Sequence, residues 1–408
     1  MYRRILTLAS LTAFIAVACG SVGAGPGATS PGEPTPDTSA APQPGSPATG
    51  SDTPAVGTLR VSTSGWATDF GKASVDLGDF LGGGPGKDGI LSIDRPLFES
   101  IDAARSWLSD RSPVISLTIR GEARAYPLGI LIWHEIVNDA VGGTPVVVTF
   151  CPLCNTGLAF ERTVDGVIHD FGTTGNLRYS DLVMYDRQTE SWWQQATGTA
   201  IVGELTGTQL RFLPAQIIGL GDFAAAHPDG RVLSRNTGQQ RDYGRNPYAG
   251  YDSVDDPFLF DGVLDGRLSP MERVVTIGVG AAAIGFPFSE LRKVGVATAT
   301  LDGEPVVAFW TPGTASALDQ SRIDDGRDIG ASGVFRPLAN GRALTFARAS
   351  GVESAAIVDQ ETGSTWSVTG LATAGPLAGI QLEPVAHGDH FWFAWAAFEP
   401  DTTIWQAP

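Results

Sequence analysis

Residues 127–158 read PLGILIWHEIVNDAVGGTPVVVTFCPLCNTGL, and residues 287–318 read PFSELRKVGVATATLDGEPVVAFWTPGTASAL. The two stretches align without a gap, and eight positions of the first, Pro127, Leu131, Gly143, Pro145, Val146, Val147, Pro152 and Leu158, recur in the second as Pro287, Leu291, Gly303, Pro305, Val306, Val307, Pro312 and Leu318. Further along, one constant spacing pairs Asp186, Thr189, Ser191 and Trp193 with Asp359, Thr362, Ser364 and Trp366. This self-similarity predicts a tandem duplication of a unit of roughly a hundred residues.

Both copies have the composition of β-sheet, with β-branched and aromatic runs separated by short glycine turns. The two-residue turns are Gly142-Gly143 and Asp165-Gly166 in the first copy and Asp302-Gly303 in the second. Such pairs favour type I′ hairpin turns. Short helices are expected only after Pro127 and around residues 222–226. We therefore expect a mainly β fold, β-rich α+β in class, whose second repeat is degenerate.

The Gly142-Gly143 turn also predicts a register for its hairpin, with strands over residues 133–141 and 144–151. Val141 would face Thr144, Val137 would face Val148, and His134 would face Cys151, because side chains directly opposite each other are neighbours. The same count in the second copy places Val294 opposite Thr311, and Thr314 stands where Cys154 does. His134, Cys151 and Cys154 are thus present in one copy and absent together from the other, as expected if only the first repeat holds a site.

Three interpretations of this cluster remain open. The cysteines could form a local disulfide, which an exported protein would retain. With His134, and with His169 as a further candidate ligand, they could bind Cu(I) or Zn(II), so copper or zinc is the candidate cofactor. Cys151-Pro152-x-Cys154 could also be a thiol redox centre, although no helix is expected to open after it, unlike in thioredoxins.

A second candidate surface lies around Trp192-Trp193-Gln194-Gln195. The second copy keeps Trp193 as Trp366, which indicates core packing, but replaces Trp192, Gln194 and Gln195 by Thr365, Ser367 and Val368. Stacking surface beside amide groups suits a sugar or peptide. We therefore expect Trp192, Gln194 and Gln195, together with Asn155, to be ligand-binding residues.

The N-terminus has the order of a bacterial lipoprotein signal. Arg3 and Arg4 precede an apolar run that ends at Ala18, and Cys19 follows in a small-residue context. That run is too short to span a bilayer. We expect residues 1–18 to be a signal peptide and Cys19 to be lipidated, which would anchor the chain at the extracytoplasmic face of the cell envelope.

Composition then divides the remainder. Residues 19–57 are rich in Gly, Pro, Ser and Thr and are expected to be a disordered tether. The length of the rest favours two units. We expect a first β-rich repeat at 58–220, a connecting segment at 221–270, and a second repeat with an aromatic C-terminal segment at 271–408.

Charge excludes one class of partner. The whole chain carries 27 basic and 44 acidic side chains, a formal charge of −17. Nucleic acid binding needs clustered Lys and Arg to neutralise phosphates, so no nucleic acid partner is expected. The sequence also lacks the motifs of serine hydrolases, phosphate-binding loops, dinucleotide sites and His-Glu-x-x-His zinc helices.

Five phrases resemble one family of bacterial and archaeal proteins, the domain of unknown function 3179. They are GKDGILSIDRPLF, ARAYPLGILIWHEIVND, VTFCPLCNTGLAF, DRQTESWWQQATGTAIVGEL and HFWFAWAAFEPDT, and the resemblance runs from about residue 84 to the C-terminus. The resemblance implies as family residues His134, Glu135, Asn138, Cys151, Cys154, Asn155, Thr156, Ser191, Trp193 and Gln194. It implies no activity, because the family has none established.

The leading hypothesis from the sequence is an extracytoplasmic lipoprotein that handles metal or performs thiol redox chemistry at Cys151, Cys154 and His134. The alternative is a noncatalytic module that binds envelope glycans or peptides through Trp192 and Gln194, with a structural disulfide nearby. A purely structural lipoprotein is the third. The sequence leaves open whether the protein is an enzyme and which envelope partner it has.

Overall fold

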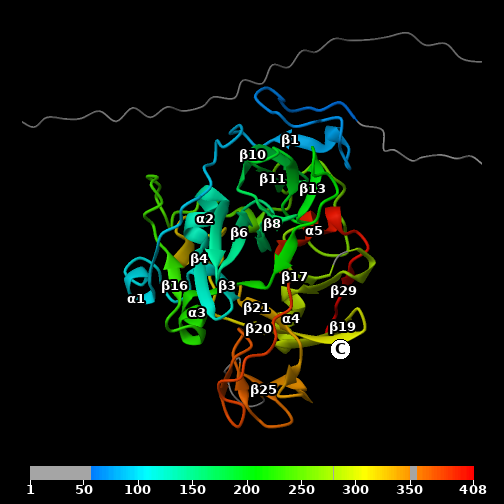
Figure 1. The fold of residues 1–408 in the computed structure, drawn as a ribbon. Coiled ribbons are helices and arrows are strands. Elements are labelled where there is room, and N and C mark those ends of the chain that lie inside the picture. Colours follow the sequence, from blue (N-terminus) through cyan, green and yellow to red (C-terminus); the bar gives the residue numbers. More distant parts are fainter. Residues whose placement is uncertain (1–56, 279, 350–355) are drawn as a thin grey trace, which may run out of the picture. The chain divides into compact units, whose positions relative to one another are not determined.

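The computed structural model describes residues 57–278, 280–349 and 356–408 (Figure 1). The predicted signal peptide, Cys19 and all but the last residue of the predicted tether lie outside these ranges. Within them no helix combines the length and apolar character needed to cross a bilayer. Strand accounts for 39% of the structure and helix for 12%, which confirms the β-rich fold class.

The first half contains the strands β1 (Phe80–Gly82), β2 (Phe98–Ser100), β3 (Pro113–Ile119), β4 (Glu122–Pro127), β5 (Ile136–Val141), β6 (Thr144–Cys151), β7 (Thr156–Glu161), β8 (Thr163–Val164), β9 (Val167–Ile168), β10 (Phe171–Arg178), β11 (Asp181–Asp186), β12 (Trp192–Gln194), β13 (Thr199–Val202), β14 (Arg211–Leu213), β15 (Ala215–Gly219) and β16 (Arg231–Leu233). Its helices are η1 (Leu77–Asp79), α1 (Ile101–Ala104), α2 (Leu128–His134) and α3 (Leu220–Ala226). The helices expected after Pro127 and around residues 222–226 are therefore confirmed as α2 and α3.

The second half contains the strands β17 (Arg273–Ile277), β18 (Ile284–Pro287), β19 (Val296–Leu301), β20 (Glu304–Thr311), β21 (Ala331–Phe335), β22 (Leu338–Ala339), β23 (Arg342–Ala343), β24 (Phe346–Arg348), β25 (Ile357–Asp359), β26 (Thr365–Trp366), β27 (Ala372–Ala374), β28 (Gly388–Phe391) and β29 (Thr403–Ile404). Its helices are η2 (Tyr251–Ser253), η3 (Gly280–Ala282), η4 (Ile323–Asp325), α4 (Phe288–Val294) and α5 (Trp392–Phe398).

The strand pairings of the first half recur in the second. In the first, β15, β3, β4 and β16 lie side by side, with only the β4–β16 pair parallel. In the second, β28, β17, β18 and β29 do the same, with only the β18–β29 pair parallel. The sheets β5-β6-β7 and β19-β20-β21 correspond, as do β10 to β13 and β24 to β27. A duplicated unit would produce this repetition, although the duplication itself stays a prediction.

The repetition extends to single hydrogen bonds. Asp186 accepts bonds from Thr189 N at 2.7 Å and Trp193 Nε1 at 3.0 Å. Asp359 accepts the corresponding bonds from Thr362 N at 2.6 Å and Trp366 Nε1 at 2.9 Å. This geometry gives both aspartates a structural role, because each one ties its turn to the following strand.

The predicted hairpins have the turn geometry that their residues require. Asp165 and Gly166 have φ values of 49° and 79°, and Asp302 and Gly303 have 52° and 82°. Two positive φ values in succession define the type I′ turn. The Val141–Thr144 and Val137–Val148 pairs are also confirmed. The expected strand 133–141 begins only at Ile136, however, because α2 runs through His134.

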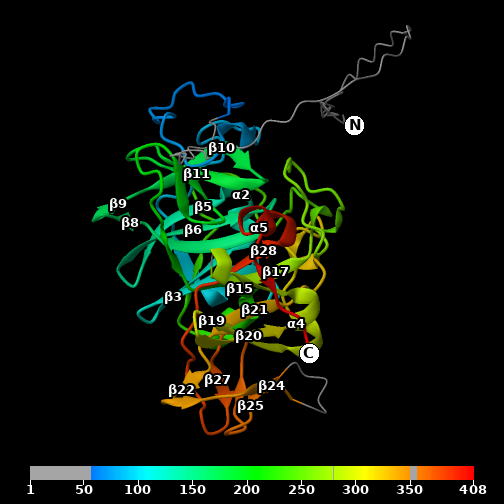
Figure 2. The ribbon, with the colours of Figure 1, turned by 90° about the vertical axis from the view of Figure 1, so that its right-hand side faces the viewer.

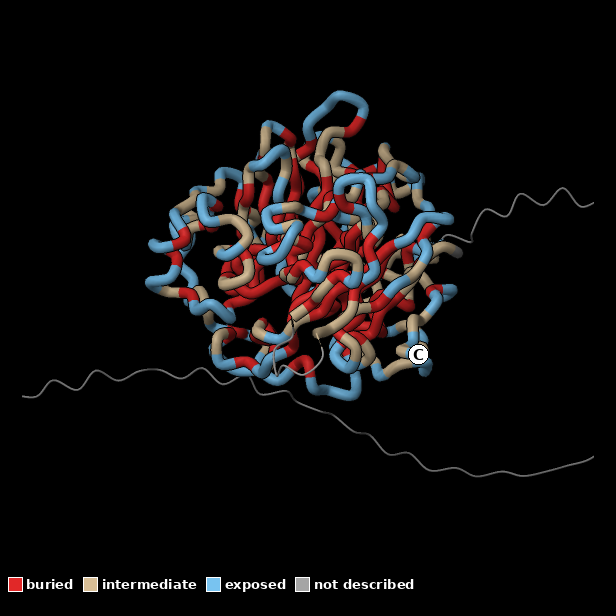
Figure 3. The backbone as a smooth tube through the Cα atoms, turned by 90° about the horizontal axis from the view of Figure 1, so that it is seen from below, coloured by how far each residue is buried: buried red, intermediate tan, exposed pale blue. Residues whose placement is uncertain are grey.

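The two halves share their sheets and cores. The largest sheet places β17 and β28 of the second half next to β7, β6 and β5 of the first (Figure 2). Gln216 Nε2 on β15 donates to the carbonyl oxygens of Ser332 and Val368 at 3.2 and 3.1 Å. The buried segments form the interior and the exposed segments the rim (Figure 3). Contacts join the described residues into one compact unit.

The aspartate turns provide a stability test. Asp359 is 1% exposed and accepts four donors, from Thr362, Ser364 and Trp366. Asp359→Asn removes the carboxylate charge and places an amide NH2, itself a donor, opposite the N–H and O–H groups that now donate to Asp359. The free energy of unfolding should therefore fall by roughly 2–4 kcal/mol. Urea unfolding measures the loss.

The matched control is Asp302→Asn, since asparagine also tolerates the positive φ of a type I′ turn. We expect a change within about 0.5 kcal/mol for this surface turn. Equal stability of the two variants would contradict a structural role for the Asp359 network.

Candidate metal and thiol centre

The two cysteines lie in the hairpin loop that joins β6 to β7. Cys151 is the last residue of β6 and pairs with Thr156, the first residue of β7, so that Cys154 lies within the four-residue loop. The sequence therefore runs from strand to loop to strand, as expected, without the helix of a thioredoxin site. Asn155 has a φ of 52°, which lets the loop close.

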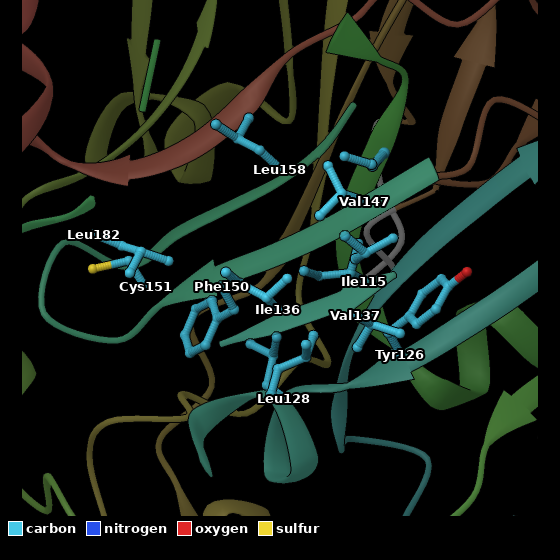
Figure 4. Close-up of a cluster of buried hydrophobic side chains, with 14 of the residues drawn as sticks. Ile115, Tyr126, Leu128, Ile136, Val137, Val147, Phe150, Cys151, Leu158 and Leu182 are labelled. Carbon is cyan, nitrogen blue, oxygen red and sulfur yellow. The ribbon is translucent and has the colours of Figure 1, made fainter. Parts of the chain in front are cut away.

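The loop is deeply buried. Cys151 and Cys154 are 1% and 0% exposed, and both are free thiols. Figure 4 shows Cys151 at the end of its strand, beside Leu182 and Phe150. A disulfide, one of the three interpretations left open, is thus not the form in which the structure presents these cysteines.

Asp181 completes the group. It is the first residue of β11 and follows Tyr179 and Ser180, which have φ values of 52° and 63° and turn the chain. One ligand atom each from Cys151, Cys154 and Asp181 lies within 4.8 Å of the other two. Two separate hairpin loops thus bring two thiols and one carboxylate together.

Hydrogen bonds fix the carboxylate in place. Cys154 Sγ donates to Asp181 Oδ1 at 3.0 Å. Asp181 Oδ2 accepts from Gln194 Nε2 at 2.5 Å and from the backbone N of Ala196 at 2.9 Å. Cys151 Sγ donates to the Ser180 carbonyl oxygen at 3.5 Å. The Asp181 carboxylate and both sulfurs therefore lie close together in one buried region.

The electrostatics of this volume disfavour negative charge. Burial raises the pKa of Asp181 to about 6 and the pKa of the Cys154 thiol above its usual range. Burial, together with the charge of Asp181, raises the pKa of Glu135 to about 8. In the described chain neither Asp181 nor Glu135 is paired with Lys, Arg or His. A cation placed among these groups would relieve the desolvation cost of each acid.

Glu135 is held in place by its backbone. It follows α2 with a φ of 59°, in the left-handed region that few non-glycine residues adopt. Its carbonyl oxygen accepts the Phe150 backbone N at 2.8 Å, which binds it to β6 just before Cys151. Several non-glycine residues with positive φ thus lie in the segments around the site. They are Glu135, Asn155, Tyr179 and Ser180. Strained backbone of this kind clusters at functional sites.

The predicted pairing of His134 with Cys151 is wrong. His134 ends α2, and its Nδ1 and Nε2 lie 2.6 Å from the Leu91 carbonyl oxygen and 2.7 Å from the Tyr243 hydroxyl. Both ring nitrogens are therefore engaged away from the thiols, and His134 does not belong to the group of converging ligand atoms. The hairpin register fails here because the chain leaves the strand at Ile136 and turns into a helix.

His169 is also apart from the cysteines. Its Nδ1 lies 3.0 Å from Asp186 Oδ1, in the network that ties the Asp186 turn. It is 4% exposed and lies outside the converging group. The geometry gives His169 a structural partner.

The predicted ligand surface is buried. Trp192 is 0% exposed, and its ring packs edge-on against Trp66, Phe70 and Phe80. Gln194 and Gln195 are 1% and 0% exposed, and Asn155 is 4% exposed. No open face of Trp192 remains for a sugar to stack on, whereas Gln194 positions Asp181 and Gln195 Nε2 donates to Thr149 Oγ1 at 2.8 Å.

Sequence reasoning missed Asp181. The spacing that pairs Asp186 with Asp359 assigns Ser354 to the position of Asp181, so this carboxylate, like the cysteines, is absent from the second copy. That difference is the signal that could have found it. Its proximity to Cys154 depends on a long-range contact that no spacing predicts.

Comparison with known proteins gives the family. A family model described as a protein of unknown function (DUF3179) matches residues 87–402. The chain belongs to this family. No curated protein matches the chain, and no solved structure matches it either. The match covers both halves and the whole Cys151–Cys154–Asp181 group, so the group lies inside the family's own domain.

Glu135 makes the stability of the metal-free protein depend on pH. Its pKa is about 8 in the folded protein against an ordinary 4.5. Between these values the folded state holds a proton that the unfolded state releases, so stability falls as the pH rises from 4.5 to 8. Glu135→Gln should reduce the drop in Tm between pH 5 and pH 8.

The control is Glu204→Gln, an exposed glutamate, which should leave the drop unchanged. Calorimetry with chelator and reductant present measures both. A Glu135→Gln profile that parallels the wild type would contradict the raised pKa.

Proposed function

We propose that this protein is an extracytoplasmic lipoprotein that binds a thiophilic divalent metal ion, zinc by preference, through Cys151, Cys154 and Asp181. The observation that carries the proposal is the convergence of two thiols and one carboxylate within 4.8 Å in a buried volume. The ion would supply the positive charge that the described side chains around Asp181 do not.

The spacing suits zinc. Two Zn–S bonds of about 2.3 Å at a tetrahedral angle hold their sulfurs roughly 3.8 Å apart. The ligand atoms here meet within a slightly larger distance, so small side-chain rotations would close the site around an ion. The short Cys154–Asp181 contact would then be replaced by two bonds to the metal.

The donor set favours zinc over copper. Thiolates suit both Cu(I) and Zn(II), whereas a carboxylate oxygen is a harder ligand that Zn(II) accepts and Cu(I) does not prefer. With His134 engaged elsewhere, the donors that remain are two thiolates and one carboxylate. Three protein ligands leave a fourth position open, as in zinc sites that bind a further molecule.

A second candidate function is thiol–disulfide exchange with a partner protein. The observation that favours it is the 3.0 Å contact between Cys154 Sγ and Asp181 Oδ1. A carboxylate whose pKa is raised toward neutral can take the proton of the second thiol as a mixed disulfide is resolved. Burial of both sulfurs opposes it, because the attacking thiolate must reach the partner.

Metal content tests the first proposal. Protein purified without chelator should contain about one zinc per chain by elemental analysis. Cys151→Ser with Cys154→Ser should contain none, and Asp181→Asn should bind at least about tenfold more weakly, since even outer-shell changes cost that much.

His134→Gln is the matched control and should retain the metal, because its ring contacts lie away from the thiols. Equal metal content in the wild type and the double cysteine variant would overturn the proposal. Metal-free protein whose Cys151 and Cys154 cycle between thiol and disulfide would favour the redox candidate instead.

Anchoring is tested separately. The proposed lipid on Cys19 should carry the full-length protein into the detergent phase of a temperature-induced phase partition, since stable anchoring comes from buried acyl chains. Cys19→Ser should move the protein to the aqueous phase, while Cys151→Ser should not. Detergent partition of Cys19→Ser equal to that of the wild type would contradict the anchor.

A further inference from the structure

A cavity lies between the two halves, apart from the cysteine group. It encloses about 340 Å³, a size typical of small-molecule sites. β7 and β14 of the first half contribute Leu158 and Phe212, and the second half contributes Leu301, Trp395 and two histidines, His387 and His390. The lining is mainly apolar.

His387 lines this cavity, and one of its ring nitrogens has no hydrogen-bond partner among the described residues. The side chain is 4% exposed, and Nδ1 lies 2.7 Å from the Val385 carbonyl oxygen. A carbonyl oxygen only accepts, so the hydrogen is on Nδ1. Nε2 is buried and has no hydrogen-bond partner among the described residues.

His387 is neutral under ordinary conditions. Burial lowers its pKa to about 4, so the ring carries no charge at neutral pH. Because Nδ1 holds the one hydrogen of the neutral ring, Nε2 bears a lone pair. His387 therefore brings to the cavity wall a buried hydrogen-bond acceptor that has no donor among the described residues.

His390 is fixed by the surrounding structure. Its Nδ1 lies 2.9 Å from Thr156 Oγ1, and its ring centroid lies 4.7 Å from that of Trp395. A Cβ on Gly388 would lie 2.4 Å from His390 Nε2 and 2.7 Å from Leu158 Cδ2. Glycine at this position thus keeps space for the ring and for the cavity wall.

We propose that this cavity binds an apolar molecule bearing a single hydroxyl group, an alcohol or a phenol, whose O–H donates to His387 Nε2. The apolar lining takes the body of the ligand, and the lone pair selects a donor. A carboxylate is disfavoured because it would meet this lone pair, and the lining has no Lys or Arg to neutralise its charge. An ammonium group is excluded by the cost of burying its charge.

Three probes that share the naphthalene ring system test the proposal by calorimetric titration of the full chain. 1-Naphthol carries the hydroxyl, 1-methoxynaphthalene has no donor, and 1-naphthoate is an anion. We expect 1-naphthol to bind at least about tenfold more tightly than either, which corresponds to one hydrogen bond. Equal affinities for 1-naphthol and 1-methoxynaphthalene, or no binding of 1-naphthol, would overturn the proposal.

His387→Phe assigns the selectivity to the ring nitrogen. This variant keeps an aromatic side chain but removes the lone pair, so 1-naphthol and 1-methoxynaphthalene should bind equally. His227→Phe, outside the cavity lining, should retain the tenfold preference. A preference that persists in His387→Phe would overturn the assignment, and the wild-type probe series decides the proposal should that variant not fold.

The double variant Cys151→Ser with Cys154→Ser separates this site from the metal centre. It should bind 1-naphthol with wild-type affinity, because the cavity contains neither sulfur. Loss of 1-naphthol binding in that variant would overturn a separate site.

Discussion

Among the contacts between the halves, the pairing of β28 with β7 matters most for the candidate site. Asp389 of the second half pairs with Gly157 of the first, and the Phe391 backbone N donates to the Cys154 carbonyl oxygen at 2.8 Å. This second bond fixes the loop that carries both cysteines from outside its own hairpin. The first half alone would leave that carbonyl with only the long 3.4 Å bond from Thr156 Oγ1, and a poorly satisfied buried carbonyl is costly. The thiol loop is therefore a product of both halves, although all three proposed ligands come from one.

The parts that the sequence predicted are those governed by neighbours along the chain. The strand 144–151, the hairpins at Asp165-Gly166 and Asp302-Gly303, and the helix after Pro127 follow from turn chemistry and spacing. The failure at His134 has the same origin. Residues 128–134 read LGILIWH, and a short apolar run fits a buried helix as well as a strand. The positive φ of Glu135 then breaks the register that the turn would otherwise have extended.

The candidate site was predictable only in part, because its members come from different hairpins. Cys151 and Cys154 are close in sequence, and their absence from the second copy marked them as special. Asp181 enters through the contact of β11 with the β6–β7 loop, and Gln194 enters as the residue that positions Asp181. The sequence marked Gln194 because the corresponding position of the second half is Ser367. It did not predict that Gln194 is buried, since burial cannot be derived from a single strand.

The two halves keep the same scaffold and differ in chemistry at the thiol loop and at one end of β11. β11 begins at Asp181, which faces the thiols, and ends at Asp186, which ties the following turn as Asp359 does in the second half. Thr311 and Thr314 take the places of the cysteines there. The Asp186 end of β11 thus supports the fold as Asp359 does in the second half, while the Asp181 end supports the candidate site of the first half alone.

The Thr156 hydroxyl lies between the thiol loop and His390, which lines the cavity described above. Its Oγ1 lies 3.4 Å from the Cys154 carbonyl oxygen and 2.9 Å from His390 Nδ1. If the hydroxyl donates to the carbonyl, His390 Nδ1 must carry a hydrogen, and Nε2 is an acceptor like that of His387. If the hydroxyl donates to His390, Nε2 carries the hydrogen instead. Because a hydroxyl has a single hydrogen, Thr156 can donate to only one of these two groups, and that choice decides which tautomer the His390 ring adopts.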